Sequence, residues 1–425
     1  MKKLTIAEAF ESLLKEPLPL RFTAYDGSAS GPEDAPFAFH LHNERGLAYL
    51  LTSIDADLAL GRPYVTGDLT LEGEGVHPGD PYAALVMLQK GLKFRVPTPA
   101  ELVILLRSMG LSQLRPPAPP PQEAPSRMRR IFEGFRHSMG RDAEAIHHHY
   151  DVSNEFYELV LGPSMTYTCA LYPTEHATLE EAQFAKYDLV ARKLDLQPGQ
   201  RLLDLGCGWG GMVRHAAGRY GVRVVGVTLS RQQATWAQEA IKEQRLDHLA
   251  EVRHLDYRLV EEGGFDAVSS IGLTEHIGVR NYPAYFGFIR DRLRPQGRLL
   301  NHCITRHDNR MRSTGRFLDR YVFPDGELIG SGRIISEAQD AGLEVQHEEN
   351  IRVHYAKTLA AWCHNLVDNW DAAVAEVGEA TARVWGLYMA GSRLAFERNE
   401  IQLHHVLATK TDADGVSGYP LRHTF

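Results

Sequence analysis

A glycine-rich turn at residues 204–211 is the part of the sequence whose residue types most clearly point to chemistry. It reads Asp-Leu-Gly-Cys-Gly-Trp-Gly-Gly and contains the spacing G-x-G-x-x-G. Glycines at this spacing allow a tight turn after a strand and let a ligand approach the backbone closely. Nicotinamide dinucleotides and S-adenosylmethionine are both bound at such turns, so the glycines predict a nucleotide cofactor and leave its identity open.

Two residues beside the turn separate these cofactors. Asp204 stands at the end of the strand that leads into the turn, where methyltransferases commonly use an acid to face the methionine portion of S-adenosylmethionine. Thr228 ends the next strand, where a nicotinamide enzyme usually offers Asp or Glu to the ribose hydroxyls. Both residues favour S-adenosylmethionine over NAD, although Thr228 also departs from the commonest methyltransferase pattern.

Other reactive side chains lie in short segments, several of them near predicted strand ends. Glu275 directly follows a strand, His302 and Ile304 end the next one, and Cys169 and Tyr355 lie in segments before and after the core. Taken singly, these residues also suit structural roles, as a core cysteine, a buried histidine or a helix cap. Ligands bind beyond the carboxyl ends of parallel strands, so the shared location favours one functional site.

The elements that position these residues follow a repeated strand, turn and helix pattern from about residue 190. This alternation predicts an α/β fold, a doubly wound Rossmann-like domain with right-handed crossovers in a parallel sheet. The expected strands are 201–205, 222–228, 251–255, 265–271 and 297–304, and the expected helices are 212–219, 231–244 and 282–293.

A proline-rich segment at 115–125 divides the chain, because prolines at this density interrupt both helices and sheets. We expect a smaller α+β N-terminal domain at 1–112, a linker with a basic amphipathic helix at 113–140, and the nucleotide-binding domain at 141–425. Within the first domain, the patterns predict strands at 36–42 and 46–52 and helices at 81–90 and 99–109.

The basic amphipathic segment 127–141 mixes arginines with Ile131, Phe132, Phe135 and Met139. Such a helix can lie on an anionic membrane surface. It can equally be a solvated helix docked between two domains, and the segment alone leaves both readings open.

Composition limits the remaining possibilities. A net charge of −8 argues against broad nucleic-acid binding. The N-terminus lacks the apolar run of a signal peptide, and no stretch reaches the ~18 apolar residues that span a bilayer. The four cysteines lack zinc-site spacing, so we expect reduced thiols and no metal. These features predict a cytoplasmic protein whose membrane contact is peripheral.

Residues from about 145 to 410 resemble the cyclopropane-fatty-acid synthase family, which includes the mycolic acid cyclopropane synthases. The matching segments are 148–154, 165–170, 203–211, 226–230, 275–278, 281–282 and 302–304. The N-terminal domain more weakly resembles the extra domain of longer bacterial members that act on membrane phospholipids. That likeness implies lipid docking or dimer contact for this domain.

The resemblance implies transfer of the methyl carbon of S-adenosylmethionine to the cis double bond of an unsaturated phospholipid acyl chain, through a carbocation. It also implies a bound bicarbonate as proton acceptor, held by Cys169, Glu275, His302, Tyr355 and the backbone of Ile304. The expected cofactor-binding residues are Tyr167, Thr168, Asp204, Gly206, Gly208, Gly210, Thr228, Leu229, Gln233, Asp256 and Tyr257.

Thr274 departs from the family pattern, which often has a larger apolar or aromatic residue before the glutamate. A smaller polar residue there could let the cation decay to a mid-chain methylene branch instead of a cyclopropane. A separate reductase would then complete a methyl branch. The resemblance further implies a dimer that works at the inner membrane surface.

Three other functions remain as alternatives. A small-molecule methyltransferase on the same fold would need neither the N-terminal domain nor the basic segment. A lipid-binding protein with an inert nucleotide fold is disfavoured because Cys169, Glu275, His302 and Tyr355 are all present. A dehydrogenase is disfavoured by Thr228.

Overall fold

The computed structural model describes residues 3–53, 55–91, 93, 95–124, 152–312, 314–324 and 326–425. The chain forms two compact units. The first comprises Met1–Pro125, Gly315–Val322 and Trp362–Leu394, and the second comprises Ser126–Thr314, Phe323–Ala361 and Ala395–Phe425. A division at the proline-rich segment alone would assign the two later segments of the first unit to the second.

The second unit is built on a seven-stranded sheet in the order β10-β11-β9-β8-β5-β6-β7. The five strands from β5 to β9 are mutually parallel, whereas β11 runs antiparallel to both of its neighbours, β9 and β10. The strands are β5 Arg201–Leu205, β6 Arg223–Thr228, β7 Ala250–His254, β8 Phe265–Ile271, β9 Leu293–Arg306, β10 Glu344–Asn350 and β11 Ile401–Thr409. The five predicted strands are confirmed, but the sheet is mixed because β10 and β11 extend it.

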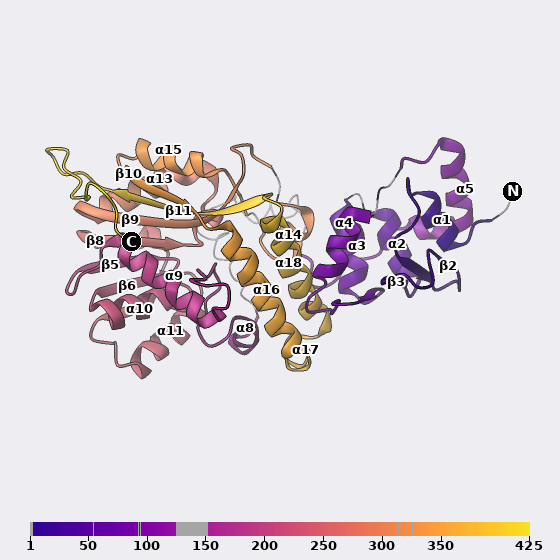
Figure 1. Ribbon diagram of the computed structural model, residues 1–425, viewed down its shortest axis with the longest axis horizontal. Helices are drawn as coiled ribbons and strands as arrows, with labels where there is room; N and C mark the ends of the chain where they lie inside the picture. The colour runs from indigo at the N-terminus through magenta and orange to yellow at the C-terminus, as the bar shows by residue number, and fades with distance from the viewer. Residues whose placement is uncertain are drawn as a thin grey trace. The chain divides into compact units, whose positions relative to one another are not determined.

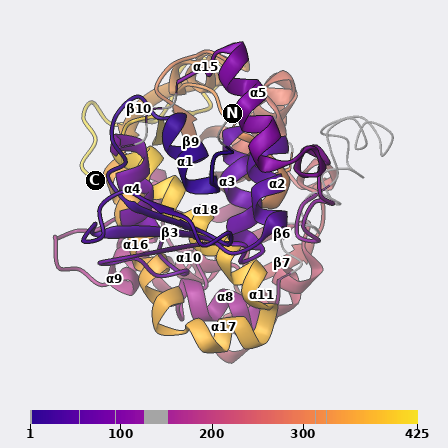
Figure 2. The ribbon, with the colours of Figure 1, turned by 90° about the vertical axis from the view of Figure 1, so that its right-hand side faces the viewer.

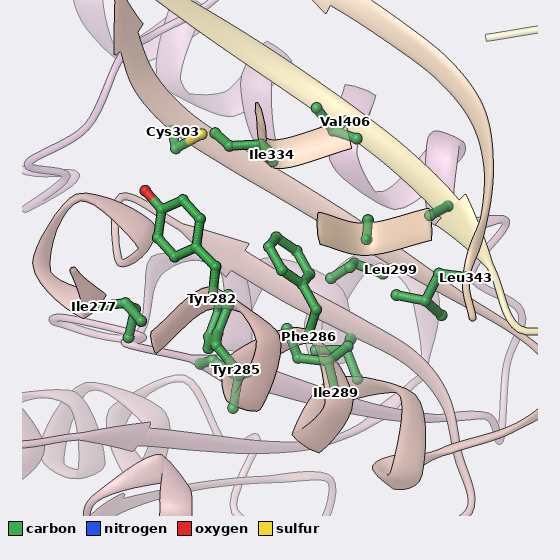
Figure 3. Close-up of a cluster of buried hydrophobic side chains, with 14 of the residues drawn as sticks. Ile277, Tyr282, Tyr285, Phe286, Ile289, Leu299, Cys303, Ile334, Leu343 and Val406 are labelled. Atoms are coloured by element: carbon green, nitrogen blue, oxygen red, sulfur yellow. The ribbon is translucent and has the colours of Figure 1, made fainter. Parts of the chain in front are cut away.

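Helices cover both faces of this sheet, as a doubly wound fold requires (Figure 1). On one face, α13 and α15 pack over β9 and β11 through an apolar cluster that includes Tyr282, Phe286, Leu299 and Val406 (Figure 3). On the other face, α9, α10 and α11 enclose a second core. The helices of this unit are α8 Asn154–Leu161, α9 Leu179–Leu194, α10 Gly211–Tyr220, α11 Arg231–Glu243, α12 Thr274–Ile277, α13 Tyr282–Arg292 and α15 Ser331–Asp340, with 3-10 turns at Tyr257–Leu259 and Val279–Asn281.

The first unit contains a four-stranded sheet in the order β2-β1-β3-β4, against which α1 and α2 pack through one apolar core (Figure 2). Its elements are α1 Ile6–Ser12, β1 Arg21–Ala24, β2 Ala29–Ser30, β3 Phe37–Leu41, α2 Glu44–Thr52, α3 Ala56–Val65, β4 Leu69–Gly73, α4 Tyr82–Gly91, α5 Pro99–Met109 and a 3-10 turn at Leu111–Leu114. Later in the chain come α14 Arg316–Tyr321 and α17 Trp370–Val377, which also belong to this unit, and α16 Arg352–Asp368 and α18 Glu379–Glu397, each of which belongs partly to the second unit.

One predicted strand of the first unit is wrong. Residues 46–52 form most of helix α2, because the Asn43 side chain accepts a hydrogen bond from the Gly46 amide and caps the helix. Leu47 is buried, and Leu50 and Leu51 pack against the same core at the i+3 and i+4 spacing of a helix. The strand predicted at 36–42 and the helices at 81–90 and 99–109 are confirmed as β3, α4 and α5.

The proline-rich segment has neither helix nor strand over 115–124, as predicted, but it is fixed to the first unit. The buried Glu123 carboxylate accepts hydrogen bonds from Arg62 at 2.7 and 2.8 Å and from Arg320 at 3.0 and 2.6 Å. The Tyr49 hydroxyl donates to the Ala118 carbonyl at 2.6 Å. The basic segment 127–141 lies outside the described residues, as do residues 148–151 of the first motif.

Within the part of the chain that the structure describes, no helix has the length and apolar character needed to cross a bilayer.

Candidate functional site

The glycine turn joins the end of β5 to the start of α10. Gly206, Gly208 and Gly210 have φ angles of +69°, +54° and +72°, which lie in the left-handed region that favours glycine. A Cβ atom at Gly211 would lie 2.1 Å from the Tyr187 hydroxyl, whereas one at Gly208 would meet nothing within 4 Å. The turn is therefore packed against protein on one side and open at Gly208, where a ligand can approach the backbone.

Asp204 lies at the end of β5, where the sequence predicts it. Its buried carboxylate accepts a hydrogen bond from the Ser269 hydroxyl of β8 at 2.6 Å. Burial raises the pKa of Asp204 to about 7, although the Ser269 hydrogen bond and the Lys186 charge counteract part of this shift. The carboxyl group is therefore poised between its neutral and charged forms near neutral pH.

The residues predicted to bind the cofactor beyond β6 lie close together. The Thr228 hydroxyl donates to Gln233 Oε1 at 2.8 Å, and both side chains are buried. The Ser230 amide donates to Thr228 Oγ1 at 3.2 Å, and His254 Nε2 contacts the Leu229 carbonyl at 3.0 Å. These contacts fix the loop between β6 and α11 at the carboxyl edge of the sheet.

Asp256 and Tyr257 follow β7 at the same edge, but protein groups already engage both side chains. The Asp256 carboxylate accepts hydrogen bonds from Arg258 Nε at 2.8 Å and Nη2 at 2.6 Å. The Tyr257 ring packs edge-on against Tyr285 and Phe288, with centroid distances of 5.5 and 5.3 Å. Both residues therefore help to build this edge of the site.

An aromatic group brings α8 and the segment at 165–168 next to the glycine turn. The Tyr157 ring lies 4.7 Å from Trp209 and 5.8 Å from Tyr167, measured between ring centroids. Trp209 Nε1 donates to Asn154 Oδ1 at 2.9 Å. Tyr167, which the sequence predicts as a cofactor-binding residue, is thereby linked through Tyr157 to the turn.

Glu275 lies just beyond the end of β8, on the short helix α12. Its Oε1 accepts the Ile304 amide of β9 at 2.6 Å, and its Oε2 has no hydrogen-bond partner among the described residues. Burial raises the pKa of Glu275 to about 7, and the Ile304 amide only partly offsets this. The resemblance assigns the Ile304 backbone to the anion, whereas here the Ile304 amide donates to Glu275.

His302 lies two residues before Ile304 on β9 and is buried. Its Nδ1 lies 2.8 Å from His405 Nε2, and its Nε2 has no partner within the described chain. Burial lowers the pKa of His302, and the charges of Lys186 and Lys193 lower it further. The imidazole is therefore neutral near pH 7, with one nitrogen turned to a histidine and the other without a partner among the described residues.

Cys169 and Tyr355 come from segments that the structure joins. The buried Cys169 thiol donates to the Ala170 carbonyl at 3.1 Å, and burial raises the pKa of the thiol. The next amide, that of Ala170, donates to Thr358 Oγ1 on α16 at 3.0 Å. One turn earlier on α16, the Tyr355 ring packs 4.6 Å from Phe396. Cys169 is therefore a neutral donor, which suits an anion site better than nucleophilic attack.

The sequence interpretation did not single out Lys186, Lys193 or His405. Lys186 and Lys193 are fully buried on α9, and Lys186 Nζ donates to the Thr168 hydroxyl at 3.0 Å. Their spacing of seven residues, on the face that also carries Val190, is a detectable signal for two inward-facing charges. His405 lies on β11, which was not predicted at all.

The chain is similar to proteins whose family is known. The family model of mycolic acid cyclopropane synthetase matches residues 137–406, well over half of the chain. A probable fatty acid methyltransferase of Mycobacterium tuberculosis is 62% identical over 405 residues, covering 95% of this chain and 94% of that protein. The cyclopropane-fatty-acyl-phospholipid synthase of Escherichia coli is 33% identical over 268 residues, covering 63% of this chain and 68% of that protein.

Solved structures that resemble this chain belong to the same family. The cyclopropane synthase MmaA2 from Mycobacterium tuberculosis has a TM-score of 0.59 and 33% identity, covering 63% of this chain and 98% of that one. The mycolic acid cyclopropane synthase CmaA1, complexed with SAH and CTAB, has a TM-score of 0.60 and 32% identity, covering 63% of this chain and 97% of that one. The chain therefore belongs to the mycolic acid cyclopropane synthetase family, whose members are S-adenosylmethionine-dependent methyltransferases that act on lipids.

Proposed function

We propose that the protein transfers the methyl carbon of S-adenosylmethionine to the cis double bond of an unsaturated phospholipid acyl chain. The product is a cyclopropane or a mid-chain methylene branch. The observation that carries the proposal is the group of buried polar atoms beyond β8 and β9. Glu275 Oε2 and His302 Nε2 are both buried there without a partner in the described residues. Unsatisfied buried polar atoms are costly unless a ligand completes them.

These atoms suit bicarbonate, the anion that the family resemblance implies. A carboxyl group whose pKa is about 7 can share a proton with such an anion, and a neutral imidazole can donate a hydrogen bond to it. Glu275 and His302 would hold the anion, and the resemblance adds the Cys169 thiol, whose hydrogen is donated to the Ala170 carbonyl in this structure. When bound, bicarbonate supplies a proton acceptor for the transferred methyl group.

An alkene is a poor nucleophile, so catalysis depends on alignment and on the exclusion of water. The glycine turn and the aromatic group of Tyr157, Tyr167 and Trp209 would orient the methyl donor. The fully buried residues nearby, including Cys169 and Lys186, would limit the access of water to this region. A dry site also protects a carbocation from capture by water.

Thr274 bears on which product forms. Its side chain is fully buried, and its hydroxyl donates to Asn301 Oδ1 at 2.6 Å. Asn301 Nδ2 in turn contacts Cys303 Sγ at 3.3 Å. The hydroxyl hydrogen of Thr274 is therefore engaged within the protein. Any influence of this residue on the cation would then come from its side-chain size, which is smaller than that of the apolar or aromatic residue common in the family.

The proposed function includes a location and an oligomeric state. It acts from the cytoplasm at the inner membrane surface, as a dimer, and a separate reductase saturates the product if that product is a methylene branch. The name of the related Escherichia coli enzyme, a cyclopropane-fatty-acyl-phospholipid synthase, supports a phospholipid acceptor. The name of the Mycobacterium tuberculosis relative, a probable fatty acid methyltransferase, is compatible with either product.

The test uses labelled S-adenosylmethionine with either oleoyl phospholipid vesicles or a soluble oleate ester. We expect label in the phospholipid, and label in the soluble ester alone would overturn the phospholipid assignment. Ring and branch products are isomers, so proton NMR of the released acyl chain must distinguish them. Upfield ring protons identify a cyclopropane, and vinylidene protons identify a methylene branch. Transfer only to small soluble acceptors would instead support a small-molecule methyltransferase.

A further inference from the structure

A row of four polar side chains leads from the surface to His302 within the second unit. Glu349 Oε2 on β10 accepts a hydrogen bond from Lys193 Nζ on α9 at 2.5 Å. Lys193 Nζ also lies 3.1 Å from His405 Nδ1 on β11, and His405 Nε2 lies 2.8 Å from His302 Nδ1. His302 and His405 are cross-strand partners in the register of β9 and β11.

Burial makes this row unusual. The side chain of Lys193 is fully buried, that of Glu349 is 39% exposed, and both histidines are buried. A buried charge is retained only when it is paired, and Glu349 pairs with Lys193. The carboxylate and the short contact favour the ammonium form of Lys193, which offers three donors and no acceptor.

The donor and acceptor roles along the row then follow in order. Because the Lys193 ammonium can only donate, His405 Nδ1 must accept. A neutral His405 then carries its proton on Nε2, which donates to His302 Nδ1. A neutral His302 with an accepting Nδ1 carries its proton on Nε2. This is the His302 nitrogen that has no partner among the described residues.

We propose that Lys193 and His405 are positioning residues that hold His302 in the Nε2–H tautomer, so that it presents a hydrogen-bond donor to an anion in the active site. The inference rests on the proposed function for the identity of that anion, but the tautomer itself is a property of the free protein. In the other tautomer, Nε2 would present a lone pair and repel an anion. The row therefore decides whether His302 can take part in the site.

Burial and the surrounding charges together keep both rings neutral. Burial lowers the pKa of His302 and of His405, and Lys186 and Lys193 from α9 lower both further. Burial lowers the pKa of the Lys193 ammonium. Glu349 and Glu348 from β10 face this ammonium, and their negative charges raise its pKa. His347 of β10 faces His405, and the Phe425 ring lies 5.3 Å from Lys193 Nζ.

The direct test is NMR of the unliganded protein with 15N-labelled histidine. Protonated and unprotonated ring nitrogens have well-separated 15N shifts, so each neutral tautomer is distinguishable. The His302 signals are assigned by their loss in His302→Gln. We expect a protonated Nε2 and an unprotonated Nδ1 for His302 between pH 6.5 and 8. A protonated Nδ1, or a ring protonated on both nitrogens across this range, would overturn the proposal.

Three variants separate positioning from mere packing. His405→Phe keeps the ring volume and removes both nitrogens, so we expect mixed His302 tautomers and a fall in kcat of at least about tenfold, with KM for S-adenosylmethionine little changed. His405→Gln retains an acceptor for Lys193 and a donor for His302, so we expect it to keep the tautomer and most of kcat. His404→Gln is the matched control, since His404 is a buried neighbour that contacts Thr305 and Glu348 instead.

The outcomes separate this inference from the proposed function. If His405→Phe fails to fold, the wild-type tautomer and the His405→Gln comparison still decide the matter. A His405→Phe protein that is folded and keeps both the tautomer and kcat would refute a positioning role. If the wild-type protein shows the Nε2–H tautomer but modifies no acyl chain, the row exists and the proposed function fails.

Discussion

The Glu275 carboxyl has one oxygen on the Ile304 amide and the other without a protein partner in the described structure. Burial raises its pKa from the ordinary value of 4.5 to about 7. The folded protein therefore holds a proton in this interval that the unfolded chain has released. The stability linked to this proton is complete below about pH 4.5 and is lost as the pH rises through about 7.

This pKa shift yields a prediction for Glu275→Gln. A shift of this size corresponds to about 3 kcal/mol of unfolding free energy. We expect the wild type to lose roughly this amount relative to the variant between pH 4.5 and 8, because a glutamine has no proton to release. Urea unfolding across this pH range measures the difference. The variant should also bind S-adenosylmethionine normally and lose most of its turnover.

The matched control for this variant is Glu327→Gln. Glu327 is a half-buried neighbour whose carboxylate accepts the Val279 amide at 2.9 Å. It should follow the wild type in its turnover. Parallel pH curves for wild type and Glu275→Gln would show that the Glu275 carboxyl is more hydrated than its burial implies. Normal turnover in Glu275→Gln would remove the residue from the site.

At the scale of elements, the turn between β5 and α10 makes two glycines differ in a testable way. A Cβ at Gly211 would collide with the hydroxyl of the partly buried Tyr187, which lies 3.0 Å from Thr166 Oγ1. A Cβ at Gly208 would meet no protein atom within 4 Å, and its φ of +54° costs an alanine only about 1–2 kcal/mol. Gly211→Ala should therefore lower stability more, and Gly208→Ala should mainly lower cofactor affinity.

Calorimetric titration with S-adenosylmethionine and thermal unfolding together check this pair. We expect Gly208→Ala to lose at least about tenfold in affinity, with only a small fall in Tm, because the added methyl group enters the open side of the turn. Gly211→Ala should show the larger fall in Tm. If Gly208→Ala binds the cofactor as well as the wild type does, the ligand does not approach the turn at Gly208.

Elements with strong local signals were predictable, and those fixed by tertiary contacts were not. The apolar strands β5, β6 and β8 and the turn after β5 follow from local pattern. β10 reads Glu-Val-Gln-His-Glu-Glu-Asn and was missed, because an exposed edge strand has little apolar alternation. β11 was missed with it, and so was His405. The carboxyl-edge residues Glu275 and His302 were predictable because parallel strands end together, but the partner that orients His302 comes from an antiparallel strand.

The segment that looked like a free linker is an anchored part of the first unit. Within that unit, Glu123 joins the proline-rich segment to α3 through Arg62 and to α14 through Arg320. The chain returns to this unit at 315–322, so the contact closes a loop of nearly two hundred residues. Tertiary ion pairs of this range leave no local trace in a sequence, which is why proline content alone suggested a linker.

The anchor depends on the charge of Glu123. Burial alone would raise the pKa of Glu123, but the hydrogen bonds from Arg62 and Arg320 outweigh it and lower the pKa. The linked stability is therefore present above the ordinary value of 4.5 and is lost as the pH falls below it. Glu123→Gln leaves two largely buried guanidinium groups without a counter-charge, so we expect the free energy of unfolding to fall by about 3 kcal/mol at pH 7.

Hydrogen exchange measured by mass spectrometry should show faster exchange in α3, α14 and residues 115–124 of this variant. Unchanged exchange there would mean that packing by the prolines, and not the ion pairs, fixes the segment, and Glu101→Gln on the exposed pair with Arg95 is the control.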